Sequence, residues 1–204
     1  MLGPTLETER LILRPPCAAD FDAWAAFMAD PEAMRFLGGP QPPAGAWRSL
    51  ALMTGAWVIS GFGNFSVIDK ASGRWVGRCG PWYPEGWPGP EIGWAFARSV
   101  WGRGYATEAA LRCLDYAFEV LGWDRVVHPI DTGNAASIAL AERIGSTLIG
   151  PARIVLPHIE LMTDLYGQSR AQWAARRPRG AGPRRRSSAS PPGAQPGRRY
   201  RRSD

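Results

Sequence analysis

Hydrophobic residues recur along this chain with two periods, and each period predicts a different kind of element. A spacing of three to four residues favours amphipathic helices, and it runs through residues 44–59, 104–121 and 135–144. Short clusters of branched and aromatic residues between turn residues predict strands. These clusters are residues 6–14, 65–69, 75–79, 91–97, 125–130, 146–155 and 159–166. The order of the elements predicts an α/β (α+β) fold in which helices cover both faces of a mixed sheet.

Residues that begin or end helices and that favour turns refine the first half of this pattern. A helix is expected to begin near Ala18 and to end at Asp30, and a second short helix is expected from Pro31 with Met34 and Leu37 on one side. The polar segment 70–74 predicts a hairpin between the two strands beside it. Residues 81–90, rich in proline and tryptophan, are expected to form a loop that packs on the core or walls a pocket.

Composition changes sharply near the C-terminus. Residues 1–175 have the length and hydrophobic content of one globular domain. Residues 176–204 contain ten arginines and one acid, so this tail carries +9 while the rest of the chain carries −3. Because the tail has almost nothing apolar to bury, we expect it to be disordered. It is either a solvated extension or a contact for an acidic partner such as nucleic acid.

Several classes of protein are disfavoured by the composition. The chain has no apolar run of membrane-spanning length and no secretory signal, so a cytoplasmic protein without membrane contact is expected. Its three cysteines, Cys17, Cys79 and Cys113, are far apart, and its only histidines are His128 and His158. This pattern predicts buried free thiols and no metal site.

A glycine-rich turn is the chief candidate for chemistry. Residues 101–106, Trp-Gly-Arg-Gly-Tyr-Ala, lie between a predicted strand and a predicted helix. Such a turn presents unpaired backbone N–H groups at the positive end of a helix dipole, where an anion binds. A lysine-containing phosphate loop is excluded because Lys70 is the only lysine, and no GxGxxG follows a strand. Taken alone, the turn could equally be a tight connection.

Three segments together resemble one known family. Residues 93–109 look like the acetyl-CoA pyrophosphate loop of GNAT-superfamily N-acetyltransferases, with Trp101 where many members carry Gln or Arg. Residues 131–137 and 141–145 are similar to the family's Asn-x-x-Ser segment and its Glu-(Lys/Arg)-x-Gly ending. Residues 6–15 resemble the first strand of the branch that contains the ribosomal-protein-alanine acetyltransferases.

The resemblance implies a GNAT-like, mostly antiparallel mixed sheet and an acetyl-CoA-dependent N-acetyltransferase that acts on a primary amine, either a protein N-terminus or a small molecule. Main-chain groups of the strand end and the glycine turn would hold acetyl-CoA, helped by the Thr107 hydroxyl and the Asn134 amide. The implied contacts with acetyl-CoA are Phe96, Ala97, Arg98, Trp101, Gly102, Arg103, Gly104, Tyr105, Ala106, Thr107, Asn134 and Ser137.

Two residues are candidates for the catalytic steps. Glu91 opens the strand that leads to the glycine turn, and partial burial would raise its pKa enough for it to accept the proton of the amine. Ser137 corresponds to a proposed proton donor to the thiolate, and the tyrosine that many members carry is replaced here by Ala141. Simpler interpretations remain open: a surface charge for Glu91, a surface serine for Ser137, and a plain helix N-cap for Asn134.

Two other functions remain compatible with the sequence. The first is a protein that binds acyl-CoA as a sensor without turnover, because the base is weakly defined and the tyrosine is absent. The second is a nucleic-acid or ribosome binder that works through the arginine-rich tail. A homodimer is also compatible with the chain. Release of thiol in the presence of different amines separates the first alternative from an enzyme.

Overall fold

The computed structural model describes residues 2–156 and 159–176. Apart from Arg176, the arginine-rich tail lies outside the described residues. Helices and strands follow one another along the chain, with short 3-10 or π-helical turns labelled η. The elements are β1 (Leu6–Glu7), β2 (Leu11–Arg14), η1 (Ala18–Asp20), α1 (Phe21–Ala29), α2 (Pro43–Ser60), β3 (Phe65–Asp69), β4 (Trp75–Trp82), β5 (Glu91–Phe96), η2 (Arg98–Val100), α3 (Tyr105–Asp115), η3 (Tyr116–Val120), β6 (Arg125–Ile130), α4 (Ala135–Arg143), β7 (Thr147–Leu156), β8 (Ile159–Ser169) and α5 (Arg170–Arg176).

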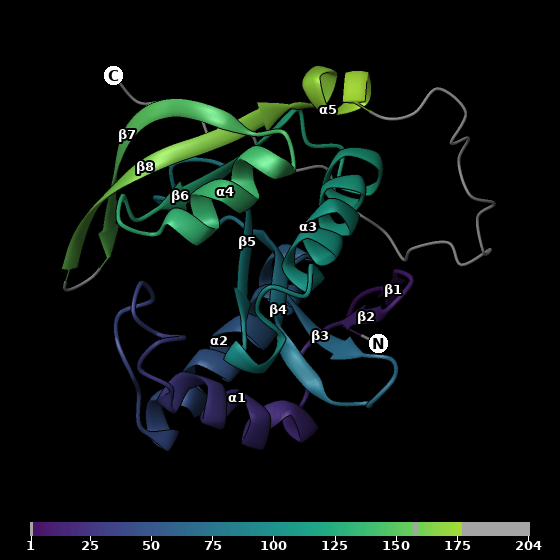
Figure 1. Ribbon diagram of the computed structural model, residues 1–204, viewed down its shortest axis with the longest axis vertical. Coiled ribbons are helices and arrows are strands. Elements are labelled where there is room, and N and C mark those ends of the chain that lie inside the picture. The colour runs from purple at the N-terminus through teal and green to yellow at the C-terminus, as the bar shows by residue number, and fades with distance from the viewer. Residues whose placement is uncertain (1, 157–158, 177–204) are drawn as a thin grey trace.

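One eight-stranded sheet runs through the molecule in the order β1-β2-β3-β4-β5-β6-β8-β7. Every neighbouring pair is antiparallel except β5 and β6, which are parallel and pair only at Glu91 and Val127. The sheet therefore has two antiparallel halves joined at one narrow point, and in Figure 1 the half with β7 and β8 lies at the top. The predicted mixed, mostly antiparallel sheet is confirmed.

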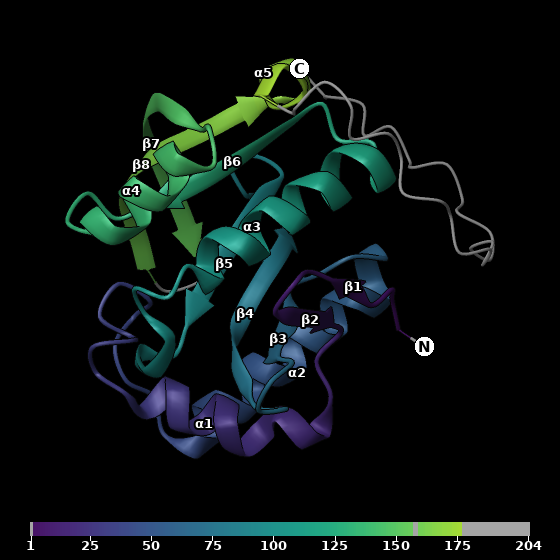
Figure 2. The same ribbon diagram turned by 45° about the vertical axis from the view of Figure 1, so that its right-hand side comes forward.

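Helices cover both faces, as predicted. Helices α1 and α2 pack through Trp24, Phe27 and Leu50 against the face that carries Ala95 and Trp75. On the opposite face α3 crosses the sheet, and α4 lies beside it over the C-terminal half (Figure 2). None of the helices within residues 2–156 and 159–176 is both long and apolar enough to cross a bilayer.

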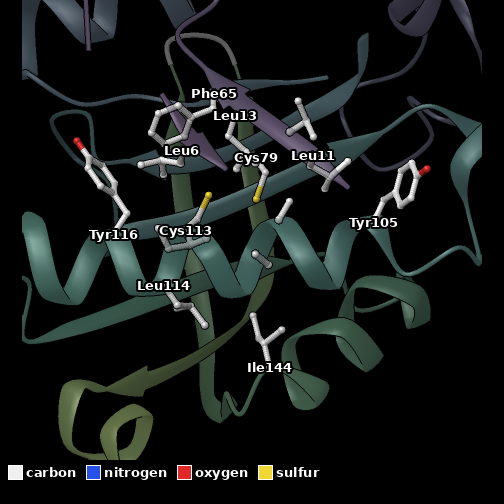
Figure 3. Close-up of a cluster of buried hydrophobic side chains, with 14 of the residues drawn as sticks. Leu6, Leu11, Leu13, Phe65, Cys79, Tyr105, Cys113, Leu114, Tyr116 and Ile144 are labelled. Carbon is white, nitrogen blue, oxygen red and sulfur yellow. The ribbon is translucent and has the colours of Figure 1, made fainter. Parts of the chain in front are cut away.

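The main core lies between α3 and the strands β2 to β4 (Figure 3). The predicted helix 104–121 is α3 followed by the π-helical turn η3, in which Leu121 N–H donates to the Tyr116 carbonyl at 3.0 Å. Cys79 and Cys113 are buried free thiols in this core, and burial raises the pKa of Cys79. Cys17 is exposed, so the expectation of three buried thiols was wrong for that residue.

Two predicted elements were also wrong, and one helix was not predicted. The expected strand 6–14 is the hairpin β1–β2, because the Thr8 hydroxyl accepts from the Leu11 N–H at 2.9 Å and closes a turn. The expected helix from Pro31 is a series of turns, begun by the Asp30 carboxylate, which accepts from the Glu32 N–H at 3.0 Å. Helix α5 was not expected, and its indole at Trp173 lies 5.0 Å from the Phe118 ring.

A buried carboxylate fastens the N-terminal segment to the sheet. Asp20, only 2% exposed, receives two hydrogen bonds from the Arg14 guanidinium, at 2.6 and 2.9 Å, and one from the Ser66 hydroxyl at 2.7 Å. Burial alone would raise the pKa of Asp20, but the hydrogen bonds from Arg14 and Ser66 outweigh it and hold that pKa below its ordinary value. The strand β2 and the start of α1 are thereby held against β3.

Replacing this carboxylate tests the anchor. Asp20→Asn should lower the free energy of unfolding at pH 7 by about 3 kcal/mol, because Arg14 keeps its charge without a partner. A carboxylate with a lowered pKa stabilises the fold above its unfolded pKa, and that contribution is lost as the pH falls through the folded pKa. The difference between wild type and variant in urea denaturation should therefore shrink below about pH 4.

The exposed Asp22 provides a matched control. Asp22→Asn should change the unfolding free energy by no more than about 0.5 kcal/mol at any pH. Equal effects of the two substitutions at pH 7 would contradict the anchoring role of Asp20.

Candidate active site

A cavity of about 1170 Å³ opens where β5 and β6 separate. Most of its wall comes from four segments: strand β5, the glycine turn with the first residues of α3, the end of β6 with the start of α4, and the turns after α1. Glu9 of the β1–β2 turn and Arg78 of β4 add to it. Most of the predicted site residues are brought together here. They are Glu91, Phe96, Trp101, Gly102, Gly104, Tyr105, Ala106, Thr107, Asn134 and Ser137.

A proline explains where the strands separate. The pairing of Glu91 with Val127 places Val127 N–H on the Pro90 carbonyl at 2.9 Å. Continued in register, the next donor from β6 to the Ile92 carbonyl would be residue 129, which is Pro129 and has no N–H. Instead the His128 side chain supplies the bond, with Nδ1 donating to the Ile92 carbonyl at 2.7 Å. The ladder ends at this point and the cavity begins.

His128 is held as a neutral imidazole. It is 2% exposed, and since Nδ1 donates to Ile92, Nε2 accepts from the Ser146 hydroxyl at 2.9 Å. Gln168 completes the cluster by donating to the Ser146 oxygen at 3.0 Å. Burial lowers the pKa of His128 to about 4, although its bond to Ile92 opposes that shift. The His128 ring also lies 4.9 Å from the Trp94 ring, so it supports the cavity wall. Because its pKa is low and both ring nitrogens are hydrogen-bonded, we do not assign it the role of a base near neutral pH.

Beyond the last pair, the backbone edge of β5 faces the cavity. By strand alternation the polar groups of Trp94 and Phe96 point to the same side as those of Ile92, away from β4. The Phe96 carbonyl accepts from the Trp101 indole at 2.8 Å. The N–H of Ala97 is donated to the Val76 carbonyl at 2.9 Å.

Three of the predicted contacts lie outside the cavity lining: Ala97, Arg98 and Arg103. The guanidinium of Arg98 pairs with Asp30 at 3.1 Å on the other side of the strand end. Arg103 points its side chain over the Tyr105 ring, with 5.2 Å between the guanidinium carbon and the ring centroid. These three residues therefore do not contribute to the cavity wall in which the other predicted contacts lie.

The glycine turn supplies an N-terminal helix end directed into the cavity. Gly102 and Gly104 have φ angles of 71° and 77°, which L side chains rarely adopt, and Gly104 immediately precedes α3. The Glu108 N–H donates to the Gly104 carbonyl, so the N–H groups before it in the first turn have no partner within the helix. Together with the helix dipole, these groups form a site for an anion.

Arg10 braces this turn, a role that the sequence did not reveal. Its guanidinium donates to the Arg103 carbonyl at 2.8 Å and to the Glu108 carboxylate at 2.6 Å. Glu108 also accepts from the Thr8 hydroxyl at 2.5 Å. The hairpin turn between β1 and β2 is thereby fastened to the glycine turn, and it places a positive charge beside the helix end. Arg10 and Glu108 are 98 residues apart in the chain. The sequence marked segment 6–15 only as similar to a family strand, and it did not predict this contact.

Glu91 lies at the point where β5 and β6 separate, and the pKa of its carboxyl group is shifted. It is half-buried and lines the cavity, and the Trp87 indole donates to its Oε2 at 2.6 Å. Burial raises the pKa of Glu91 to about 7, against the opposing effects of the Trp87 hydrogen bond and the nearby Arg78 charge. Near neutral pH this carboxyl can therefore both take up and release a proton.

Asn134 and Ser137 lie on the opposite wall. The Asn134 side chain accepts from the Ser137 N–H at 3.1 Å, which confirms the N-cap interpretation of Asn134. The Ser137 oxygen accepts from the Trp94 indole at 3.2 Å, so its own hydrogen is available to another acceptor. The cap leaves the amide nitrogen of Asn134 beside the cavity. Among the described residues no group of three or more metal-ligating side chains is present.

Comparison with known proteins agrees with this geometry. Residues 10–147 match the model of the acetyltransferase (GNAT) domain family. The Bacillus subtilis protein YkkB is 37% identical over an alignment of 153 residues, and the match covers 69% of this chain and 83% of YkkB. The Bacillus licheniformis N-acetyltransferase p20 is 32% identical over 139 residues, covering 67% of this chain and 78% of p20.

Solved structures share the whole architecture. An acetyltransferase from Agrobacterium tumefaciens superposes with a TM-score of 0.72 at 36% identity, covering 81% of this chain and 94% of that one. A putative ribosomal-protein-serine acetyltransferase from Vibrio cholerae and a ribosomal-protein-S5-alanine acetyltransferase from Vibrio fischeri have the same fold at 19% and 16% identity. At that distance they show the fold alone.

His128 offers a direct test of how the strands are held apart. His128→Leu should lower the unfolding free energy at pH 7 by about 2–4 kcal/mol, because the Ile92 carbonyl and Ser146 hydroxyl lose their partner. A histidine with a lowered pKa stabilises the fold above its unfolded value of about 6.5, and this contribution is lost as the pH falls toward 4. The gap between wild type and variant should narrow over that range in denaturant titrations.

His128→Asn separates the hydrogen bond from the ring. An Asn amide nitrogen can occupy the place of Nδ1, so this variant should recover part of the lost stability without the pH dependence. If both variants were as stable as wild type, the His128 side chain would not be what replaces the missing Pro129 N–H at the Ile92 carbonyl.

Proposed function

This chain belongs to the GNAT acetyltransferase family, and we propose that it transfers the acetyl group of acetyl-CoA to a primary amine. The observation that carries the proposal is that one cavity contains both an anion-binding helix end and, at the mouth of the strand parting, a carboxylate with a pKa of about 7. The first suits the pyrophosphate of CoA, and the second suits removal of a proton from an amine.

The residues present fit acetyl-CoA. The left-handed glycines leave the turn without side chains where a phosphate would approach, and Arg10 adds positive charge beside it. The open edge of β5 offers the N–H and C=O groups of Trp94 and the N–H of Phe96 to the amides of a pantetheine arm, while the Phe96 carbonyl is held by the Trp101 indole. The Asn134 amide lies on the facing wall. Acetyl-CoA supplies the activated acetyl group, and the chain's own residues position it.

Glu91 and Ser137 divide the proton transfers. The amine nitrogen forms a bond to the thioester carbonyl carbon, the C–S bond breaks, and Glu91 accepts a proton that the nitrogen loses. The Ser137 hydroxyl donates a proton to the departing sulfur, while the Trp94 indole holds the Ser137 oxygen in place. Exchange with solvent then returns a proton to Ser137 and removes one from Glu91, so the net change is one proton moved from nitrogen to sulfur. This arrangement replaces the tyrosine that many family members use, since position 141 is alanine.

The acceptor is either a protein N-terminus or a small amine. The turns after α1 line the cavity with Glu32, Arg35, Phe36 and Leu37, so the acceptor would meet both charged and apolar groups. A protein that binds acyl-CoA without turnover is the rival function. The pKa of Glu91 favours the enzyme, and release of CoA thiol over a panel of amines decides between them.

Gly104 tests the acetyl-CoA site. Gly104→Val should weaken acetyl-CoA binding by about 2 kcal/mol or more, roughly thirtyfold, because a branched side chain at this positive φ distorts the turn and its N–H groups. Isothermal titration calorimetry measures the change. Gly122→Val is a matched control, since Gly122 has a φ of 74° and lies outside the cavity lining.

Both valine variants should lose similar stability, whereas only the one at Gly104 should lose affinity. Equal affinity for acetyl-CoA in folded Gly104→Val and wild-type protein would rule out the glycine turn as the pyrophosphate site.

Glu91 and Ser137 can be tested through the pH–rate profile. A base must be deprotonated, so the wild-type rate should rise with pH through about 7. Glu91→Gln should remove that rise and lower kcat by about 10²-fold or more. Ser137→Ala should lower kcat while leaving the Kd for acetyl-CoA nearly unchanged. Wild-type kcat in both variants would mean that neither side chain takes part in proton transfer.

A further inference from the structure

Trp87 connects the loop 83–90 to the catalytic carboxylate. Its indole reaches Glu91 four residues further along the chain and donates to Oε2 at 2.6 Å. Trp87 is half-buried and lies outside the cavity lining, so it contacts the carboxylate from behind. The indole thus fixes the rotation of the carboxyl group without occupying the space that an acceptor needs.

Gly93 makes room for the second oxygen. Residues 91 and 93 share one face of β5, and a Cβ placed on Gly93 would lie 2.6 Å from Glu91 Oε1. A side chain at position 93 would therefore force the end of the Glu91 side chain to move from its present place. Oε1 therefore occupies the space above Gly93, within the cavity that both residues line. With Oε2 held by Trp87, Oε1 is the oxygen directed at the acceptor.

We propose that Trp87 and Gly93 are positioning residues that hold Glu91 with Oε1 toward the acceptor amine, so that the loop 83–90 controls proton removal. The proposal rests on the proposed function, in which Glu91 is the base. The loop is itself anchored, because Trp87 N–H donates to the Pro84 carbonyl at 3.2 Å and Gly89 packs against Val127 of β6. The position of Glu91 therefore depends on the loop, through the Trp87 indole, and on the pairing of β5 with β6, through Val127.

Other charged groups around Glu91 stay the same when Trp87 is changed. Arg78 approaches from β4 and favours the charged carboxylate, while its guanidinium donates to the Asn64 side chain at 3.0 Å. Glu32 and Arg35 from the turns after α1, and Asp131 after β6, line the same cavity. A change in titration after replacing Trp87 therefore reports the indole bond.

The test combines Trp87→Phe with direct titration of Glu91. Phenylalanine keeps an aromatic ring but has no donor, so the charged carboxylate loses a hydrogen bond and its pKa should rise by about one unit. Carbon-13 NMR of labelled glutamate carboxyls measures that pKa without turnover. The rising limb of kcat/KM should move to higher pH by the same amount, and the rate on the plateau above it should also fall, because the carboxylate is no longer held with Oε1 toward the acceptor.

Two further variants complete the design. Tyr83→Phe removes a hydroxyl from the exposed tip of the same loop and should leave the Glu91 pKa and the pH profile unchanged. Gly93→Ala should displace Oε1 and lower kcat by about tenfold or more at every pH, with the Kd for acetyl-CoA retained. Thermal melting confirms that each variant is folded.

The outcomes are distinguishable. An unmoved Glu91 pKa and an unmoved pH–rate limb in folded Trp87→Phe would overturn the positioning role. Full kcat in folded Gly93→Ala would overturn the assignment of Oε1. If Glu91→Gln instead kept the wild-type limb, the base of the proposed function would fail, whatever the NMR titration showed for Trp87.

Discussion

The missing backbone N–H at Pro129 is the constraint on which the site depends. A parallel ladder between β5 and β6 would otherwise continue past Glu91 and Val127 and close the sheet. Because Pro129 cannot donate, the His128 imidazole satisfies the Ile92 carbonyl, and burial keeps that ring neutral. The Pro90 and Ile92 carbonyls both have donors at the junction, so the strands can separate without leaving these two groups unsatisfied. The free edge of β5 and the cavity both follow because a side-chain donor, His128 Nδ1, takes the place of the backbone N–H that Pro129 lacks.

The anion site depends on a contact between distant parts of the chain. Left-handed glycines let the chain turn from β5 into α3, but they do not fix where the turn points. Arg10 and Glu108 do so, by joining the β1–β2 turn to the Arg103 carbonyl and the first turn of the helix. The Tyr105 hydroxyl adds a bond to Asp69 of β3 at 3.0 Å. The helix end is thereby held toward the cavity, and its dipole acts on whatever anion binds there.

Patterns local in sequence were predictable, and contacts between distant segments were not. The alternation of strands and helices predicted the mixed sheet, and the glycines at 102 and 104 predicted a tight turn between a strand and a helix. That Pro129 has no N–H to donate is evident from the sequence, but its replacement by the His128 side chain depends on the register of β6 against β5. The Trp87–Glu91 and Arg10–Glu108 contacts depend on how a loop and a hairpin fold back. Helix α5 was missed because it packs on the core through contacts between residues far apart in the chain, such as Trp173 with Phe118 and Asp115.

The central claim is that acetyl-CoA binds between the separated strands, on the edge of β5 and the end of α3. Hydrogen–deuterium exchange with and without acetyl-CoA tests it most directly, because the backbone N–H groups on the open edge of β5 and in the first turn of α3 have no strand or helix partner among the described residues. We expect slower exchange at residues 94, 96, 102 and 104–106 when acetyl-CoA is present, with little change in β3 or α2. Protection confined to other segments, or no protection at these amides under saturating acetyl-CoA, would contradict it.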